Sequence, residues 1–162
     1  MENIDMKSRV EIDNTSITFY VPIKPLSYNG YYRNTRTGKR VKTGAGHEYD
    51  EALTHYISDY ADEIDGFFST LGEDECIRLK LVVGKSNYYT EKGAVHKRSG
   101  DISNTVKVIE DKVFSHVTGF DDYIVKSVVL DEYPCDDDFF AISFHKIPHN
   151  LEQLKVNWFR SI

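Results

Sequence analysis

The chain has 162 residues, of which 40% are hydrophobic and 28% are charged, and its formal net charge is −6. This length suits one domain, and this balance is typical of a globular protein rather than a disordered acidic chain. No apolar run reaches the roughly 18 residues that a membrane-spanning helix needs, and the first ten residues lack the apolar core of a signal peptide. We therefore expect neither a membrane protein nor a secreted one.

Taken in chain order, the first half of the sequence predicts a strand, a loop and a helix. Residues 1–15 show no hydrophobic period and are expected to form a flexible N-terminus, with the domain spanning residues 16–162. Residues 17–21 alternate between apolar and polar types, which predicts a half-buried strand that stops at Pro22 and Pro25. Residues 24–46 are predicted to form an extended loop. Between residues 47 and 64, apolar types recur at helical spacing and predict one helix ending at Gly66.

The second half predicts the rest of a mixed sheet. Residues 77–83 alternate as a second strand, and an apolar stripe over residues 102–117 predicts a second helix ending at Gly119. Residues 123–132 and 139–147 are rich in β-branched and aromatic types, and we expect them to pair as a hairpin across the turn between them. The fold class is therefore α+β, a single domain with a mixed sheet and two helices in the order β-α-β-α-β-β. Residues 150–162 are expected to add a short docked helix.

Positive charge is concentrated in two segments. Residues 24–46 contain six basic residues and no acidic one, and residues 84–100 carry a net charge of +3, so the rest of the chain carries −15. Two basic segments on an acidic body are able to focus a polyanion at one place. Tyr28, Tyr31 and Tyr32 interleave with the arginines of the first segment, a combination suited to stacking on bases and pairing with phosphates. The alternative is a tyrosine-rich loop packed against the body.

Cysteine and histidine patterns exclude several kinds of site. Cys76 and Cys135 are too few for a disulfide framework, and neither belongs to a CxxC or Cys/His metal pattern, so a reducing cytoplasm is the simplest setting. The six histidines form no recognised zinc pattern. The sequence also contains no GxGxxG, Walker loop or GxSxG motif, so nucleotide-driven and acyl-transfer chemistry lose support.

Three carboxylates lie at the ends of predicted elements: Asp101 at the start of the second helix, and Asp121 with Asp122 after its glycine stop. Carboxylates beside a basic surface suit a divalent-metal phosphodiesterase, because hard oxygen ligands hold Mg²⁺ while basic side chains hold the polyanion. The alternative is structural, since Asp is also a preferred helix cap and turn residue. Lys107 and Asp111 are likewise explained as an i,i+4 pair on a polar helix face. The acidic run 136–138 is expected to be a solvated hairpin tip.

Four segments together resemble the RusA family of Holliday-junction resolvases of bacteria and their phages. KPLSYNGYYR (24–33) resembles the family's N-terminal loop, and GHEYDEAL (46–53) resembles the start of its first helix. GDISNTVKVIEDKV (100–113) resembles its acidic signature, Asp-x-Asp-Asn-x-x-Lys followed by a later Asp. GFDDYIVKSV (119–128) resembles the Asp-Asp segment that comes next. The resemblance covers roughly residues 17–147.

The resemblance implies a Mg²⁺-dependent endodeoxyribonuclease, with Mn²⁺ as a possible substitute, that acts as a homodimer on four-way DNA junctions in recombination and repair. It implies a bacterial cytoplasm and a bacterial or phage gene. By position, Asp101 and Asp122 would be metal ligands, Asp121 an adjoining acidic residue, and Lys107 a group that stabilises phosphate charge. Ser103 stands at the remaining metal position, where the family has its second signature Asp, which removes one negative charge.

The residues expected to bind DNA lie in the two basic segments: Lys24, Asn29, Tyr31, Tyr32, Arg33, Arg36, Lys39, Arg40, Lys97 and Arg98. Two alternatives to the nuclease remain open. One is a catalytically impaired junction-binding protein of the same fold, which Ser103 favours. The other is an acidic interaction protein that has kept only the scaffold.

Overall fold

The structure, a computed structural model, describes residues 9–96 and 102–149. In chain order its elements are β1 (Arg9–Ile12), β2 (Ser16–Val21), α1 (Tyr28–Tyr31), β3 (Tyr32–Asn34), β4 (Arg40–Lys42), α2 (Gly44–Tyr56), the 3₁₀ turn η1 (Ser58–Tyr60), α3 (Ala61–Ser69), β5 (Glu75–Lys85), α4 (Ile102–Phe114), the 3₁₀ turn η2 (Asp122–Ile124), β6 (Val125–Pro134) and β7 (Phe139–Pro148). The predicted α+β class with a mixed sheet is confirmed.

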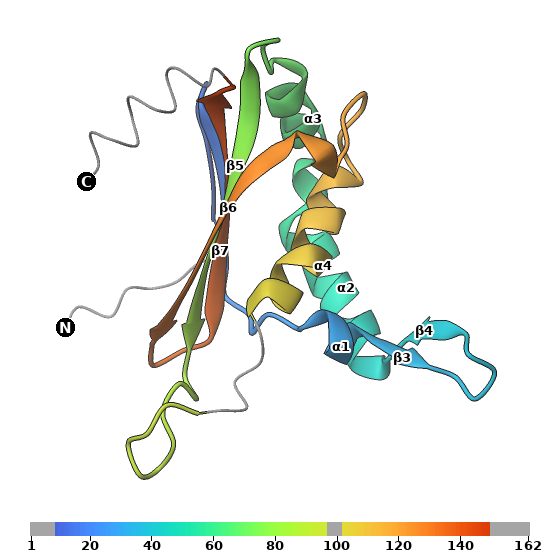
Figure 1. The fold of residues 1–162 in the computed structure, drawn as a ribbon, viewed down its shortest axis with the longest axis vertical. Coiled ribbons are helices and arrows are strands. Elements are labelled where there is room, and N and C mark those ends of the chain that lie inside the picture. The colour runs from blue at the N-terminus through green and yellow to red at the C-terminus, as the bar shows by residue number, and fades with distance from the viewer. Residues whose placement is uncertain (1–8, 97–101, 150–162) are drawn as a thin grey trace.

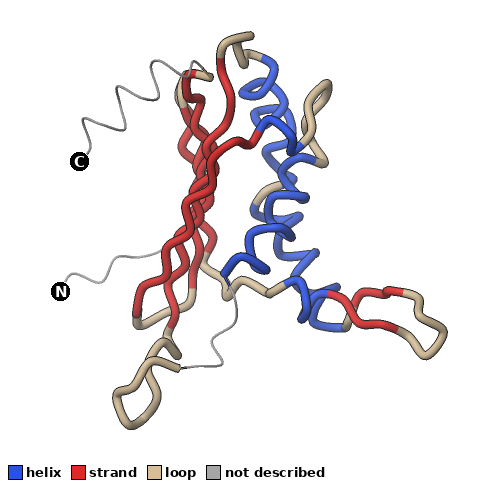
Figure 2. Tube along the Cα trace, in the orientation of Figure 1, coloured by secondary structure: helices blue, strands red, loops and turns tan. Residues whose placement is uncertain are grey.

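A five-stranded sheet forms one layer and the helices form the other (Figure 1). The strand order is β1-β2-β7-β5-β6, with β5 and β6 parallel and the other neighbours antiparallel. Helices α2, α3 and α4 lie on the same face of the sheet (Figure 2). The strands β3 and β4 form a separate two-stranded ribbon that projects from the helical layer at one end of the molecule.

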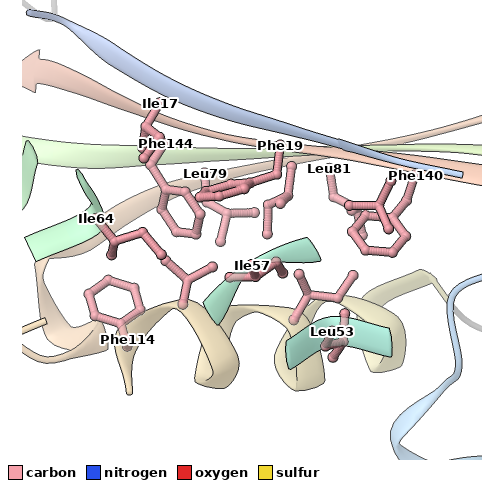
Figure 3. Close-up of a cluster of buried hydrophobic side chains, with 14 of the residues drawn as sticks. Ile17, Phe19, Leu53, Ile57, Ile64, Leu79, Leu81, Phe114, Phe140 and Phe144 are labelled. Atoms are coloured by element: carbon pink, nitrogen blue, oxygen red, sulfur yellow. The ribbon is translucent and has the colours of Figure 1, made fainter. Parts of the chain in front are cut away.

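Alternating apolar side chains of the strands build the core against the helices (Figure 3). Phe19 of β2, Leu81 of β5 and Phe144 of β7 are fully buried, as are Leu53 and Ile57 of the helical layer. Each fully buried large apolar side chain stabilises the fold by about 1.5–3 kcal/mol. This core fixes the face of α4 that turns to the sheet, and therefore the face that remains for a functional site.

The hairpin predicted for the last two strands is wrong. The strands β6 and β7 run antiparallel and are joined by a short turn, but β5 lies between them and pairs with both. Leu81 of β5 faces Leu130 of β6 on one side and Ile142 of β7 on the other. The place between β6 and β7 belongs to β5, a long strand with a buried core face, and chain proximity does not decide the pairing.

The N-terminal boundary and the first helix also differ from the predictions. Strand β1 begins at Arg9, inside the segment expected to be flexible, and pairs through its backbone with β2. The single helix predicted to end at Gly66 is two helices, since the chain turns at η1 and Gly66 lies inside α3. Both helices keep their apolar residues on the same core, so periodicity does not reveal the break. The docked helix predicted for residues 150–162 lies outside the described residues.

Candidate functional site

The basic segment 24–46 is ordered rather than an extended loop, which corrects the prediction. The Ser27 side chain caps α1 by accepting a hydrogen bond from the backbone N–H of Gly30 at 3.2 Å. The turn between β3 and β4 closes through Thr35, whose backbone N–H donates to the carbonyl of Lys39 at 2.7 Å. Gly38 takes a φ of 79° there, which is a conformation that glycine adopts at no steric cost. Local turn chemistry thus builds a ribbon from a segment without hydrophobic period.

We call residues 32–42 the basic ribbon. It carries five basic residues and no acidic one: Arg33, Arg36, Lys39, Arg40 and Lys42. The first four are exposed, and so are Lys24 and Asn29, which precede the ribbon. Tyr31 is only 6% exposed, which leaves it little surface to contact DNA directly. The ribbon therefore presents a concentrated positive charge at the surface, and the DNA-binding role of Tyr31 stays a prediction.

Tyrosine side chains connect the ribbon to the body. Arg40 Nη1 donates to the Tyr28 hydroxyl at 2.7 Å, and its Cζ lies 5.0 Å from the Tyr28 ring centroid and 5.8 Å from that of Tyr32. The Tyr28 and Tyr32 rings lie 5.0 Å apart and are tilted by 58°. Cation–π contacts of this kind hold an arginine in place while its remaining donors stay available.

Asp50 of α2 joins the ribbon to α4. Its carboxylate lies 3.0 Å from Lys42 Nζ and 3.2 Å from Lys112 Nζ, and it accepts a hydrogen bond from the Tyr31 hydroxyl at 3.1 Å. Burial raises the pKa of Asp50, but hydrogen bonds from Lys42 and Lys112 outweigh burial and hold that pKa below its usual value. A carboxylate with three donors from three elements fixes the base of the ribbon against the helical layer.

A second group of charged side chains, which we call the acidic cluster, lies farther along the fold on α4 and η2. Three carboxylates surround the ammonium group of Lys107: those of Glu110, Asp111 and Asp122. Asp121 is the fifth member, beside Asp122 and near enough to Glu110 to influence its charge. Lys107 Nζ lies 2.6 Å from Asp122 Oδ2, 2.8 Å from Asp111 Oδ1 and 3.8 Å from Glu110 Oε2. The Asp121 side chain caps η2 by accepting from the backbone N–H of Asp122 at 2.7 Å.

The two titratable groups at the centre of the cluster are perturbed in different ways. Burial lowers the pKa of Lys107, but hydrogen bonds to Asp111 and Asp122 outweigh burial and raise it above its usual value, so the ammonium stays charged. Burial raises the pKa of Glu110, and the carboxylates of Asp122 and Asp111 raise it further while Lys107 opposes them. Glu110 therefore holds a proton at higher pH than an exposed glutamate does.

The structure brings some of the predicted catalytic residues together. Lys107 contacts Asp122, Asp121 accepts a hydrogen bond from the Asp122 N–H, and the i,i+4 pair of Lys107 with Asp111 is also present. Ser103 is exposed on the first turn of α4. Three predicted site residues lie outside the described ranges: Lys97, Arg98 and Asp101.

The sequence analysis missed Glu110 of the acidic cluster, Asp50 at the base of the ribbon, and the burial of Lys85. Glu110 has a sequence signal, since it lies one helical turn after Lys107, but three residues of spacing alone do not reveal its burial. Asp50 has no local signal, because its partners come from distant parts of the chain. Lys85, counted in the second basic segment, is buried at the end of β5 and lies 2.6 Å from Glu132 Oε1. Its charge is thus paired within the fold.

Among residues 9–96 and 102–149, no group of three or more His, Cys, Asp or Glu side chains is arranged to hold a metal ion. The helices of this part of the chain also lack the length and apolar character that a bilayer crossing requires. Comparison of the sequence with protein-family models and with curated proteins found no match.

Proposed function

We propose that this protein binds branched DNA through the basic ribbon and hydrolyses a phosphodiester bond at the acidic cluster with Mg²⁺. The contact between Lys107 and Asp122 carries this proposal, because it joins two segments that resemble the RusA family and lie 15 positions apart. The 2.6 Å distance brings the basic residue of the first segment onto the carboxylate of the second.

The short route between ribbon and cluster supports the same proposal. Lys112 of α4 contacts Asp50 at the base of the ribbon, and its chain neighbour Asp111 contacts Lys107 in the cluster. DNA phosphates held by the ribbon would therefore continue toward the cluster along one helix. Phosphate contacts position the DNA, and a fixed distance to the carboxylates then selects which bond is cut.

The carboxylate of Asp122 is the type of ligand that Mg²⁺ prefers, together with water. Asp122 would hold the ion, with Asp101 and Ser103 completing the set that the resemblance implies. A bound Mg²⁺ would polarise the phosphate and supply a nucleophilic water at neutral pH. Because the Lys107 ammonium stays charged among three carboxylates, it would offset negative charge on the phosphate oxygens. Asp121, through its hydrogen bond to the Asp122 N–H, would hold that carboxylate in position.

The proposal includes a homodimer, since a four-way junction has two-fold symmetry and a closed dimer offers two equivalent sites. Light scattering of the protein free and on DNA is expected to report two copies. A monomer in both states would remove this part of the proposal and leave the site unaffected.

Cleavage of an end-labelled four-way junction tests the proposed function. We expect cuts in two opposing strands with Mg²⁺ or Mn²⁺, none with EDTA, and weaker cutting of a duplex of the same sequence. Binding measured at several salt concentrations is expected to weaken as salt rises, because phosphate contacts release counterions. A protein that binds no DNA at low salt would contradict the proposal.

A second candidate function is junction binding without cleavage, and Ser103 favours it. A neutral hydroxyl stands where the family has a metal-binding Asp, and the side chain is exposed at the start of α4. If the site is intact but weakly charged, Ser103→Asp should lower the Mg²⁺ concentration needed for half-maximal cleavage. Ser103→Ala is the matched control and should leave that concentration close to the wild-type value. Binding without cleavage by all three proteins would favour the second candidate.

A further inference from the structure

A cleft lies between the base of the basic ribbon and α4, and the mechanism proposed above gives it no role. Three tyrosines and three charged residues line it: Tyr28, Tyr31, Tyr32, Asp50, Asp111 and Lys112. The tyrosines come from α1 and β3, the aspartates from α2 and α4, so four elements meet there. Asp111 belongs both to the cleft and to the acidic cluster, where its carboxylate contacts Lys107.

The tyrosines that line the cleft offer aromatic surface for stacking. Tyr28 and Tyr32 are half-buried, so part of each ring stays accessible. Contact with Arg40 fixes both rings, and the Tyr31 ring packs edge-on against Tyr32 at 4.6 Å. Rings held in advance lose little conformational freedom when a planar group stacks on them. Aromatic side chains beside a positive groove are the recurring device for binding unpaired bases.

The charged residues that line the cleft offer hydrogen-bonding groups, and their charges are largely offset by ion pairs. Asp50 is paired with Lys42 and Lys112, and Asp111 is paired with Lys107. Carboxylate oxygens with a remaining lone pair accept from the amino or ring N–H groups of a base, and the lysines donate to its carbonyls. The cleft thus combines an aromatic wall with polar edge contacts, which matches a nucleobase better than a bare phosphate.

The size of the cleft limits what it holds. Its open volume is about 190 Å³, which gives room for one planar heterocycle. A base in the cleft would have left its partner, as bases do when a protein takes them out of the stack.

We infer that the cleft receives one unpaired base of the bound DNA, from a nucleotide next to the phosphate at the acidic cluster. This inference rests on the proposed function, because it needs a bound strand. Asp111 touches both sites, so a base in the cleft places its own phosphate toward Lys107. Branch points are where bases lose their partners at least cost, which would give the protein a preference for branched DNA that phosphate contacts alone do not supply.

Photo-crosslinking tests where the base goes. A four-way junction carries 5-iododeoxyuridine at its branch point, the complex with the full chain is irradiated, and the attachment site is mapped by mass spectrometry. We expect the crosslink at Tyr28 or Tyr32. A crosslink confined to the ribbon turn, or none while the junction is demonstrably bound, would overturn the inference. Absence of junction binding would instead remove the proposed function, so the two failures are distinguishable.

Affinity for a short oligothymidine gives a second readout. Tyr32→Leu should weaken single-strand binding by roughly 5- to 150-fold, the range for losing one stacked base, and should change duplex affinity little. Tyr32→Phe keeps the ring and should bind as wild type. Because Tyr32→Leu alters packing, Ser115→Trp, which fills the cleft from its α4 side, should give the same loss with all tyrosines present. Equal affinities for all variants would contradict the inference.

Competition by free thymidine monophosphate distinguishes a base that belongs to a bound DNA strand from a free nucleotide. We expect it to compete poorly with the crosslink, because it lacks the strand that the ribbon holds. Competition at the concentration that oligothymidine requires would show a free-nucleotide site and overturn the strand origin of the base.

Discussion

The basic ribbon and the acidic cluster differ in how the fold holds them. The ribbon projects from the body, carries like charges, and is ordered by short-range turn contacts and by the Asp50 carboxylate at its base. The cluster sits on a packed helix, and its one ammonium is shared among carboxylates from α4 and η2. Charge on an exposed ribbon suits long-range attraction of a polyanion, whereas charge held at fixed distances suits chemistry. Changes in the two regions should therefore have separable effects.

The largest expected effect is a loss of cleavage rate when a carboxylate of the acidic cluster is replaced. Asp122→Asn should lower the cleavage rate by about 100-fold or more, since even indirect partners of a metal cost 10- to 100-fold. Junction affinity should stay at the wild-type value, because the ribbon is untouched. Asp62→Asn, an exposed residue of α3, makes the same chemical change elsewhere and should leave cleavage unchanged. A wild-type rate in Asp122→Asn would show that the cluster is not the reacting site.

The second-largest expected effect is a loss of DNA affinity when arginines of the ribbon are replaced. The double variant Arg33→Glu with Arg36→Glu should weaken binding to junction and duplex alike, and the slope of log affinity against log salt should fall by about two. The control is the double variant Arg78→Glu with Lys80→Glu, which makes the same change in net charge at two exposed positions of β5. If the control weakens binding as much as the ribbon variant, net charge rather than the ribbon holds the DNA.

A smaller effect is expected where the two regions are joined. Asp50→Asn should lower the melting temperature at pH 7 by about 2–4 °C, or roughly 1 kcal/mol, because Lys42 and Lys112 lose a shared partner. The pKa of Asp50 is lowered on folding, so its contribution is present above the ordinary value of 3.8 and is lost as the pH falls through the lowered value.

Thermal melts from pH 7 down to pH 2 test whether the stabilising contribution of Asp50 is lost at low pH. The difference between Asp50→Asn and wild type should shrink below pH 3.8. Glu51→Gln, at the exposed neighbouring position of α2, is the matched control. A difference that is constant with pH would mean that the Asp50 charge does not hold the ribbon base.

The smallest expected effect is a change in stability on replacing Glu110, and at pH 7 it is a gain, whereas replacing Asp50 gives a loss. Burial and neighbouring carboxylates raise the pKa of Glu110 on folding, so its contribution is fully present below the ordinary value of 4.5 and is lost as the pH rises through the raised value. Glu110→Gln should therefore raise the melting temperature at pH 7 by at most about 2–4 °C, and this gain should vanish at pH 4. Glu63→Gln, an exposed position on α3, is the control. Destabilisation at pH 7 would contradict the direction of the pKa change.

An element of the fold could be predicted from the sequence only where its own residues carry a hydrophobic pattern. Strands β2 and β5 and helix α4 follow from their hydrophobic periods, because each buries one face against a single core. Strand β1 and the basic ribbon have no such period and are ordered by backbone pairing and turn contacts, so their residues give no warning. The place of β5 between β6 and β7 is a choice among pairings that sequence order does not encode.

The sequence identified several residues of the candidate site, but it did not show which of them contact one another. Spacing marks Lys107 and Asp111 as helix neighbours, while the meeting of Lys107 with Asp122 depends on how the chain returns from α4 into β6. The predicted role of Asp101 stays a prediction, since that residue lies outside the described ranges. The burial of Lys85 against Glu132 follows from strand register, which a count of charges ignores.

The central claim is that the ribbon holds the DNA and the cluster cuts it, and single-turnover cleavage at rising protein concentration tests it most directly. The same labelled junction is used for wild type, for Asp122→Asn, and for the double variant Arg33→Glu with Arg36→Glu. We predict that the ribbon variant reaches the wild-type rate once protein saturates the junction, whereas Asp122→Asn stays slow at every concentration. A saturated ribbon variant that remains slow, or an Asp122→Asn protein that recovers with concentration, would contradict this division of roles.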